Sequence, residues 1–274
     1  MSQQPIGIFD SGIGGLTVLQ AVETLLPHEN LVYFGDTARV PYGTKSPRTV
    51  RQFAIEAVLM LMQHDVKCIV AACNTVSALA LHDLKDTFRV PVIGVIDPGV
   101  RSAITTTRNG HIGIMATSGT VREHMYAHLL AGYDHHVQVI ERACPLLVPL
   151  AEEGILDGPI VNLALDRYVQ DLPQQVDTLI LGCTHYPLLQ EAIQAYMGPD
   201  IQLVDSPAAT AETLQQLLRE DELTNTSDDP GRLQLCLSDV QPHYPDLIAR
   251  FLGRTIEAAD IQPMAPVTLG SESS

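Results

Sequence analysis

Basic residues are scarce in this sequence. Lys and Arg number 16 against 32 Asp plus Glu, which gives a formal net charge of -16 at pH 7. Binding to a nucleic-acid backbone or to an anionic membrane depends on clustered Lys and Arg. We therefore expect neither nucleic acid nor membrane as a partner.

Long hydrophobic runs and a disulfide framework are missing as well. Residues 1–5 carry neither the basic start nor the apolar stretch of a signal peptide, and no later run approaches the roughly 20 residues that span a bilayer. The cysteines are odd in number and spread along the chain, at Cys68, Cys73, Cys144, Cys183 and Cys236. A reducing, cytoplasmic location is predicted, because such a set does not resemble a disulfide scaffold.

What the sequence does contain is typical of a folded α/β protein. Of its 274 residues, 46% are apolar and 18% charged. Short apolar runs predict buried strands at 6–9, 31–34, 68–72, 92–96, 112–115, 137–140, 178–181 and 201–204. Segments with helical spacing lie between most of them, at 16–26, 49–63, 76–85, 121–130 and 187–197. This alternation predicts parallel sheets built from βαβ units.

The first half of the chain is echoed in the second. The triplet Ile6-Gly7-Ile8 returns as Ile112-Gly113-Ile114, an offset of 112 minus 6, or 106. The runs that end in Cys73 and Cys183 are 110 residues apart, and Asp97 and Asp205 are 108 apart. Three similar offsets favour a duplicated α/β unit over the alternative that any two βαβ segments look alike.

The duplication predicts two α/β domains. We expect the first to comprise residues 1–98 together with a C-terminal return, 209–274, and the second to comprise residues 99–208. The crossings are predicted at 97–99 and 205–207, and the polar stretch 225–231 is predicted to be a surface loop.

Reactive side chains follow several of the predicted strands. Ligands of open parallel sheets bind beyond the carboxyl ends of the strands. Those positions hold Asp10-Ser11, Cys73-Asn74-Thr75, Ala116-Thr117 and Cys183-Thr184-His185. Cys73 and Cys183 each precede a helix, whose N-terminal dipole favours a thiolate, so this pair is the best catalytic candidate. The other three cysteines are interpreted as small buried hydrophobes.

Nucleotide and metal sites are less well supported. Gly12 and Gly14 begin a dinucleotide fingerprint, but its third glycine is replaced by Thr17. The segment 43–46 lacks the upstream glycine of a phosphate-binding loop. No metal is predicted, because the cysteines and histidines near the strand ends lack the spacing of zinc ligands. The pattern alone leaves Glu152 undecided between a site residue and a solvated acidic turn.

Four segments closely resemble the glutamate racemase family. They are Asp10–Val18 (DSGIGGLTV), Val40–Gly43 (VPYG), Ala72–Thr75 (ACNT) and Gly182–Pro187 (GCTHYP). Their order and spacing match the family from residue 6 to about residue 208. The resemblance implies two pseudosymmetric α/β domains with the active site in the cleft between them, and conversion of L-glutamate to D-glutamate for peptidoglycan. It also implies that neither pyridoxal phosphate nor metal is needed.

The resemblance assigns roles to single residues. Cys73 and Cys183 look like the two acid/bases, with Asp10 beside the first, and Glu152 and His185 beside the second. The positions that resemble substrate contacts are Asp10, Ser11, Tyr42, Gly43, Asn74, Thr75, Thr184, His185 and, in a segment that varies more within the family, Thr117 and Thr120.

Two thiols suit a racemase for a reason independent of the family. Inverting a stereocentre through a planar carbanion requires one proton to leave one face and another to arrive on the opposite face. A cysteine hydrolase activated by His185, which would leave one thiol idle, and a non-catalytic amino-acid-binding protein remain as alternatives. The sequence leaves the oligomeric state open, with a homodimer among the options.

Overall fold

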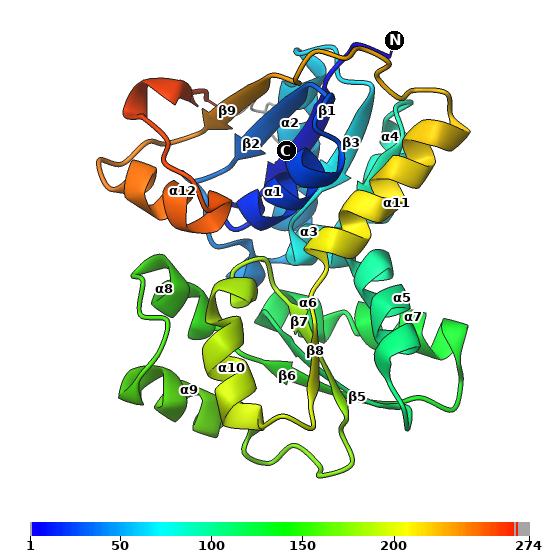
Figure 1. The fold of residues 1–274 in the computed structure, drawn as a ribbon, viewed down its shortest axis with the longest axis vertical. Helices are drawn as coiled ribbons and strands as arrows, with labels where there is room; N and C mark the ends of the chain where they lie inside the picture. The colour runs from blue at the N-terminus through cyan, green and yellow to red at the C-terminus, as the bar shows by residue number, and fades with distance from the viewer. Residues whose placement is uncertain (1, 266, 268–274) are drawn as a thin grey trace, which may run out of the picture.

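The computed structural model describes residues 2–265 and 267, and these form two parallel sheets flanked by helices (Figure 1). The larger sheet has the order β10-β9-β2-β1-β3-β4 and the smaller one the order β6-β5-β7-β8. The strands of the larger sheet are β1 (Ile6–Asp10), β2 (Leu31–Gly35), β3 (Cys68–Ala71), β4 (Val92–Gly94), β9 (Leu233–Leu237) and β10 (Ile261–Pro263). Those of the smaller sheet are β5 (His111–Ala116), β6 (Gln138–Ala143), β7 (Thr178–Gly182) and β8 (Gln202–Val204). The α/β fold with two parallel sheets is thus confirmed.

The helices connect the strands in the alternation that parallel pairing requires. They are α1 (Leu16–Leu25), α2 (Pro47–Met62), α3 (Asn74–Leu79), α4 (Leu81–Thr87), α5 (Ile96–Thr106), α6 (Ser118–Arg122), α7 (Met125–Tyr133), α8 (Leu147–Glu152), α9 (Pro159–Val169), α10 (Gln190–Met197), α11 (Pro207–Glu220) and α12 (Tyr244–Leu252). Single 3₁₀ turns occur at η1 (Tyr42–Thr44), η2 (Tyr186–Leu189) and η3 (Ala258–Asp260). None of the helices in the described part of the chain has both the length and the apolar character to cross a membrane.

The two sheets repeat one strand order. Four adjacent strands of the larger sheet run β2-β1-β3-β4, and the smaller sheet runs β6-β5-β7-β8. Each of the strands β1 to β4 therefore has a counterpart four strands later in the chain, among β5 to β8. Cys73 follows β3 and Cys183 follows its counterpart β7. The predicted duplication agrees with this repeated topology.

The chain crosses between the two sheets twice, each time through a helix. Residues 97–99, predicted as a crossing, lie in the first turn of α5, and residues 205–207 lead into α11. These two helices contact each other. The domain bounds at 98 and 209 stay a prediction, and residues 266 and 268–274 of the predicted return segment lie outside the described residues.

Several predicted elements differ from the structure in their bounds. The helix predicted over 76–85 is divided at Ala80 into α3 and α4, and the one predicted over 121–130 is divided near His124, whose φ of 51° interrupts the helical backbone. Strands β9 and β10 and helices α5, α8, α9, α11 and α12 were not predicted. The stretch 225–231 contains neither helix nor strand, as expected of a loop.

Every residue of β1, β2, β3 and β7 is buried, because helices cover both faces of these parallel sheets. One apolar cluster joins β1 and α1 to α11 and α12, and another joins β3 to α2. The late helix α12 therefore packs on the first part of the chain, with Leu247, Ile248 and Phe251 in the core. This packing brings Phe251 against His185, a residue of the cavity described next.

Candidate active site

Cys73 and Cys183 line the same small cavity between the two sheets. The cavity has a volume of about 80 Å³, and each thiol enters it from the end of an equivalent strand, β3 or β7. Both cysteines are almost completely buried, at 5% and 6% exposure. All five cysteines of the chain are free thiols.

Most of the predicted substrate-contacting residues line this cavity. They are Ser11, Tyr42, Gly43, Asn74, Thr75, Thr117, Thr184 and His185. Val40, Pro41, Thr44, Ser118, Pro145, Val148 and Pro149 line it as well and were not predicted. Their largely apolar character gives the thiols a dry environment, in which electrostatic interactions are stronger than in water.

The surroundings of Cys73 keep its proton in place. Burial raises the pKa of Cys73 to about 12, and the nearby Asp10 adds to this effect, while a hydrogen bond with the Ser11 hydroxyl at 3.6 Å opposes it. Burial also raises the pKa of Asp10, although the charge of His185 works in the opposite direction. One carboxylate oxygen of Asp10 accepts from the backbone N–H of Gly12 at 3.1 Å, and the other, Oδ1, is buried without a partner.

Cys183 has a different set of neighbours. Its sulfur lies 3.8 Å from Nδ1 of His185, whose Nε2 lies 3.0 Å from Oε1 of Glu152. Burial disfavours the charged imidazole, but the hydrogen bonds to Cys183 and Glu152 outweigh it and raise the pKa of His185 to about 10. The cationic imidazolium is thus favoured beside this thiol at neutral pH.

Two close contacts fix the position of the His185 ring. The ring of Phe251, at the end of α12, meets it edge-on, with centroids 5.4 Å apart and planes at 85°. The backbone of Gly14 also approaches the ring closely, because a Cβ placed on Gly14 would lie 2.5 Å from Nδ1 of His185. Gly14 therefore has a steric role in the loop after β1, which the search for a nucleotide fingerprint did not reveal.

Hydrogen bonds connect polar side chains of the cavity to buried residues behind them. Thr75 and Thr117 share a hydrogen bond of 3.0 Å between their hydroxyls, and Thr117 in turn contacts the hydroxyl of Thr120 at 3.1 Å. Asn74 accepts from the hydroxyl of buried Tyr126 at 2.7 Å, which leaves its amide nitrogen Nδ2 buried without a partner. This amide is a free hydrogen-bond donor at the cavity.

Four predicted residues occupy positions other than a simple contact with the cavity. Thr120 is fully buried behind Thr117, and Asp10 lies behind Cys73 and Ser11, so neither is part of the cavity lining. Glu152 lines a neighbouring hollow rather than the cavity itself. The hydroxyl of Tyr42 donates to Asp36, which does not line the cavity. Tyr42 therefore contributes its ring and backbone, rather than its hydroxyl, to the cavity wall.

Asp36, Tyr126, Phe251 and Gly14 were missed by the sequence analysis. Tyr126 and Phe251 lie within apolar helical segments, where the sequence marks them only as core residues. Their site contacts are made across long stretches of chain, 52 residues for the Tyr126–Asn74 bond and 66 (251 minus 185) for the Phe251–His185 pair. No local pattern could reveal them.

The fold and the cleft define a class of protein: a duplicated parallel α/β protein that presents two buried thiols to one small cavity, one thiol near a carboxylate and the other near an imidazole. The family model for Asp/Glu/Hydantoin racemase matches residues 14–214. A glutamate racemase of Geobacter metallireducens is 47% identical over 254 residues, covering 92% of this chain and 94% of that protein.

Solved structures give the same result. The glutamate racemase of Francisella tularensis subsp. tularensis SCHU S4, in complex with D-glutamate, aligns with a TM-score of 0.90 at 34% identity, covering 97% of this chain and 98% of that one. The Thermus thermophilus glutamate racemase, in complex with β-chloro-D-alanine, aligns with a TM-score of 0.86 at 41% identity, covering 96% and 98%. This chain belongs to the glutamate racemase family, within the Asp/Glu/hydantoin racemases, and is an isomerase. The family predicted from the four sequence motifs is confirmed.

Proposed function

We propose that the protein interconverts L- and D-glutamate by moving protons between Cα and two thiols, Cys73 and Cys183. The observation that carries the proposal is the placement of these thiols, which reach one cavity from equivalent strand ends of two different sheets. A substrate held between them presents one face of its Cα to each sulfur. Inversion requires this two-sided arrangement.

The proposed reaction is balanced without an added reagent. The thiolate of one cysteine takes the Cα proton, and the electron pair of the broken C–H bond stays on the substrate as a carbanion. The thiol of the other cysteine then gives its proton to the opposite face of Cα, which forms the new C–H bond. The enantiomer leaves, and the two cysteines have exchanged protonation states.

The resting protonation states follow from the neighbours of each thiol. The pKa of Cys73, raised to about 12, makes this residue the thiol. The imidazolium of His185 stands 3.8 Å from the sulfur of Cys183, and a cation at this position stabilises a thiolate. We assign the thiolate of the free protein to Cys183, with Glu152 holding the imidazolium in place.

The polar residues of the cavity suit an amino acid as the ligand. The unpartnered Nδ2 of Asn74 and the hydroxyls of Thr75 and Thr117 provide donors for substrate carboxylates. Glutamate is the proposed substrate because the relatives are glutamate racemases and one of them is bound to D-glutamate.

The remaining parts of the proposal concern the cell. D-Glutamate produced by this reaction would serve peptidoglycan synthesis, and hence cell-wall formation and cell shape. A cytoplasmic location is proposed on the grounds of five free thiols, two of which the reaction needs reduced. A homodimer stays a prediction.

The test is incubation with L-glutamate in D₂O, using protein stripped of metal ions and pyridoxal phosphate. We expect optical activity to fall while deuterium enters Cα. Cys73→Ser and Cys183→Ser should each suppress racemisation, with Cys236→Ser, a buried cysteine outside the cavity, as the matched control. A covalent adduct on Cys183 with no Cα exchange would instead support the hydrolase, and binding without exchange would support the binding protein.

A further inference from the structure

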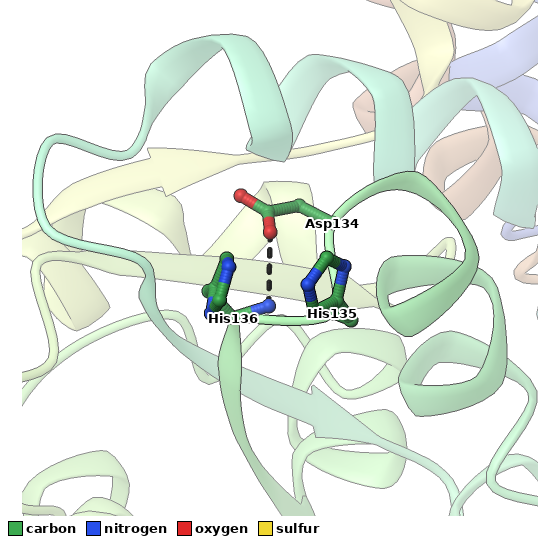
Figure 2. Close-up of side chains that lie close together, drawn as sticks. All are labelled: Asp134, His135 and His136. Atoms are coloured by element: carbon green, nitrogen blue, oxygen red, sulfur yellow. Dashed lines mark hydrogen bonds between the residues drawn. The ribbon is translucent and has the colours of Figure 1, made fainter.

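The loop between α7 and β6 brings three potential metal ligands together. Asp134, His135 and His136 are consecutive and exposed, and one ligand atom from each lies within 4.8 Å of the others. Figure 2 shows the Asp134 carboxylate turned back over the loop toward the backbone N–H of His136, with an imidazole ring on either side in that view. We propose that these residues form a binding site for a divalent transition-metal ion, outside the cleft.

The ligand set favours this class of ion. Two imidazole nitrogens and one carboxylate oxygen suit Zn²⁺, Ni²⁺ or Cu²⁺, whereas Mg²⁺ and Ca²⁺ prefer oxygen ligands alone. With metal–ligand bonds of about 2.1 Å, neighbouring ligand atoms stand roughly 3 to 4 Å apart. Exposed side chains can close from 4.8 Å to that separation by small rotations. Three ligands leave further positions for water.

The backbone of the loop is fixed on both sides. The N–H of Asp134 donates to the carbonyl of Leu130 at 2.9 Å, and that of Gln138 donates to the carbonyl of Gly110 at 2.8 Å. Within the loop, Oδ1 of Asp134 accepts from the N–H of His136 at 2.9 Å. Ligands on such a backbone lose less conformational entropy on binding than ligands on a flexible tail.

The charges and hydrogen bonds of the loop also suit a cation. Asp134 caps the C-terminal end of α7, where the helix dipole is negative. The two rings are tilted against each other, with centroids 4.1 Å apart. Within residues 2–265 and 267, neither imidazole makes a hydrogen bond and Asp134 makes no ion pair. Their lone pairs are thus available to a metal.

The sequence-based prediction of no metal rested on the residues near the strand ends and on family resemblance. Asp-His-His in immediate succession matches none of the spaced zinc motifs considered there. The present site is a surface site on a single loop, and none of its residues lines the cavity that holds Cys73 and Cys183.

Isothermal titration of the whole protein with Ni²⁺ tests the proposal, because Ni²⁺ binds imidazole well and does not oxidise thiols as Cu²⁺ does. We expect one ion per chain at this loop, and His135→Ala or His136→Ala should weaken its binding at least about tenfold. Asp134→Asn keeps the hydrogen bond to the backbone of His136 but removes the charge, so it should also weaken binding.

His82→Ala is the matched control, because His82 is equally exposed and pairs with only one carboxylate, Asp86, at 3.2 Å. It should bind Ni²⁺ as the parent protein does. Binding that persists undiminished in His135→Ala and His136→Ala would place the metal elsewhere, on the cleft thiols or on His82, and would overturn the proposal. Absence of Ni²⁺ binding to the parent protein would do the same.

Discussion

The unequal surroundings of the two cavity thiols, Cys73 and Cys183, predict an unequal ionisation that can be measured directly. Burial raises the pKa of Cys68, Cys73 and Cys144 to about 12 and that of Cys236 to about 11. At pH 9 about one in a thousand Cys73 side chains is a thiolate, compared with about half for a cysteine at the unshifted value of 9.0. Cys183 differs from these four thiols, because the imidazole of His185, whose pKa is raised to about 10, lies 3.8 Å from its sulfur.

Thiolate absorbance near 240 nm provides the assay. At neutral pH the folded protein should show about one thiolate per chain, well below the pH at which tyrosines with a pKa of about 10 contribute. Cys183→Ser should abolish this signal, and Cys73→Ser should leave it unchanged. Both variants keep a small polar side chain, so circular dichroism should confirm an intact fold.

Removing one charge should change the second thiol in a known direction. Asp10 is the second cause, after burial, of the raised pKa of Cys73. Asp10→Asn keeps the shape and lowers that pKa, so a second thiolate should ionise at lower pH than in the parent protein. If the neutral-pH thiolate vanished in Cys73→Ser and survived in Cys183→Ser, the proposed resting state would be refuted. An unchanged titration in Asp10→Asn would refute the role given to its charge.

Three further predictions concern the ring of His185. Gly14→Ala should lower racemase activity strongly at unchanged secondary structure, because its Cβ would lie 2.5 Å from Nδ1 of His185 and closer still to Thr184. Phe251→Leu should lower kcat beyond what its loss of stability explains, since it frees the imidazole, whereas Phe34→Leu, equally buried but in β2, should affect mainly the melting temperature. The pKa of His185 is about 10 in the folded protein and 6.5 in the unfolded chain. Protonation of His185 therefore stabilises the fold fully below about pH 6.5, and this stabilisation is lost as the pH rises through 10. His185→Asn should flatten the curve of melting temperature against pH over this range. The first prediction is contradicted if Gly14→Ala is as active as the parent protein. The second is contradicted if Phe34→Leu loses as much kcat as Phe251→Leu, and the third if His185→Asn keeps the parental curve of melting temperature against pH.

The sequence predicted the parts of the fold that depend on local pattern. All eight predicted strands form, because continuous apolar runs are what a parallel sheet covered on both faces requires. β10 is three residues long and β9 begins with half-buried residues, so neither gives a continuous apolar run. Helix α12 is amphipathic but lies beyond the duplicated region, so no counterpart in the other half of the chain marks it.

The candidate site could be predicted only as far as chain position determines it. Cys73 and Cys183 follow buried strands, so the rule for parallel sheets selects them without knowledge of the family. Glu152 ends a six-residue helix, and its carboxylate meets His185 only through the packing of α8 beside η2. The Phe251 contact depends on the return of the chain to the first sheet. Such contacts are properties of tertiary packing, and their chemical roles stay predictions.

The duplication explains both why there are two thiols and why they differ. The repeat places the sulfurs in equivalent positions, but two residues beyond Cys183 stands His185, whereas two residues beyond Cys73 stands Thr75. Asp10 ends β1, and the corresponding position at the end of β5 is Ala116, which can carry no charge. Each half thus supplies one charged partner that the other half lacks: an anion beside Cys73 and a cation beside Cys183. An acid and a base of the same chemical type can therefore rest in opposite protonation states, and the proposed reaction starts from that difference.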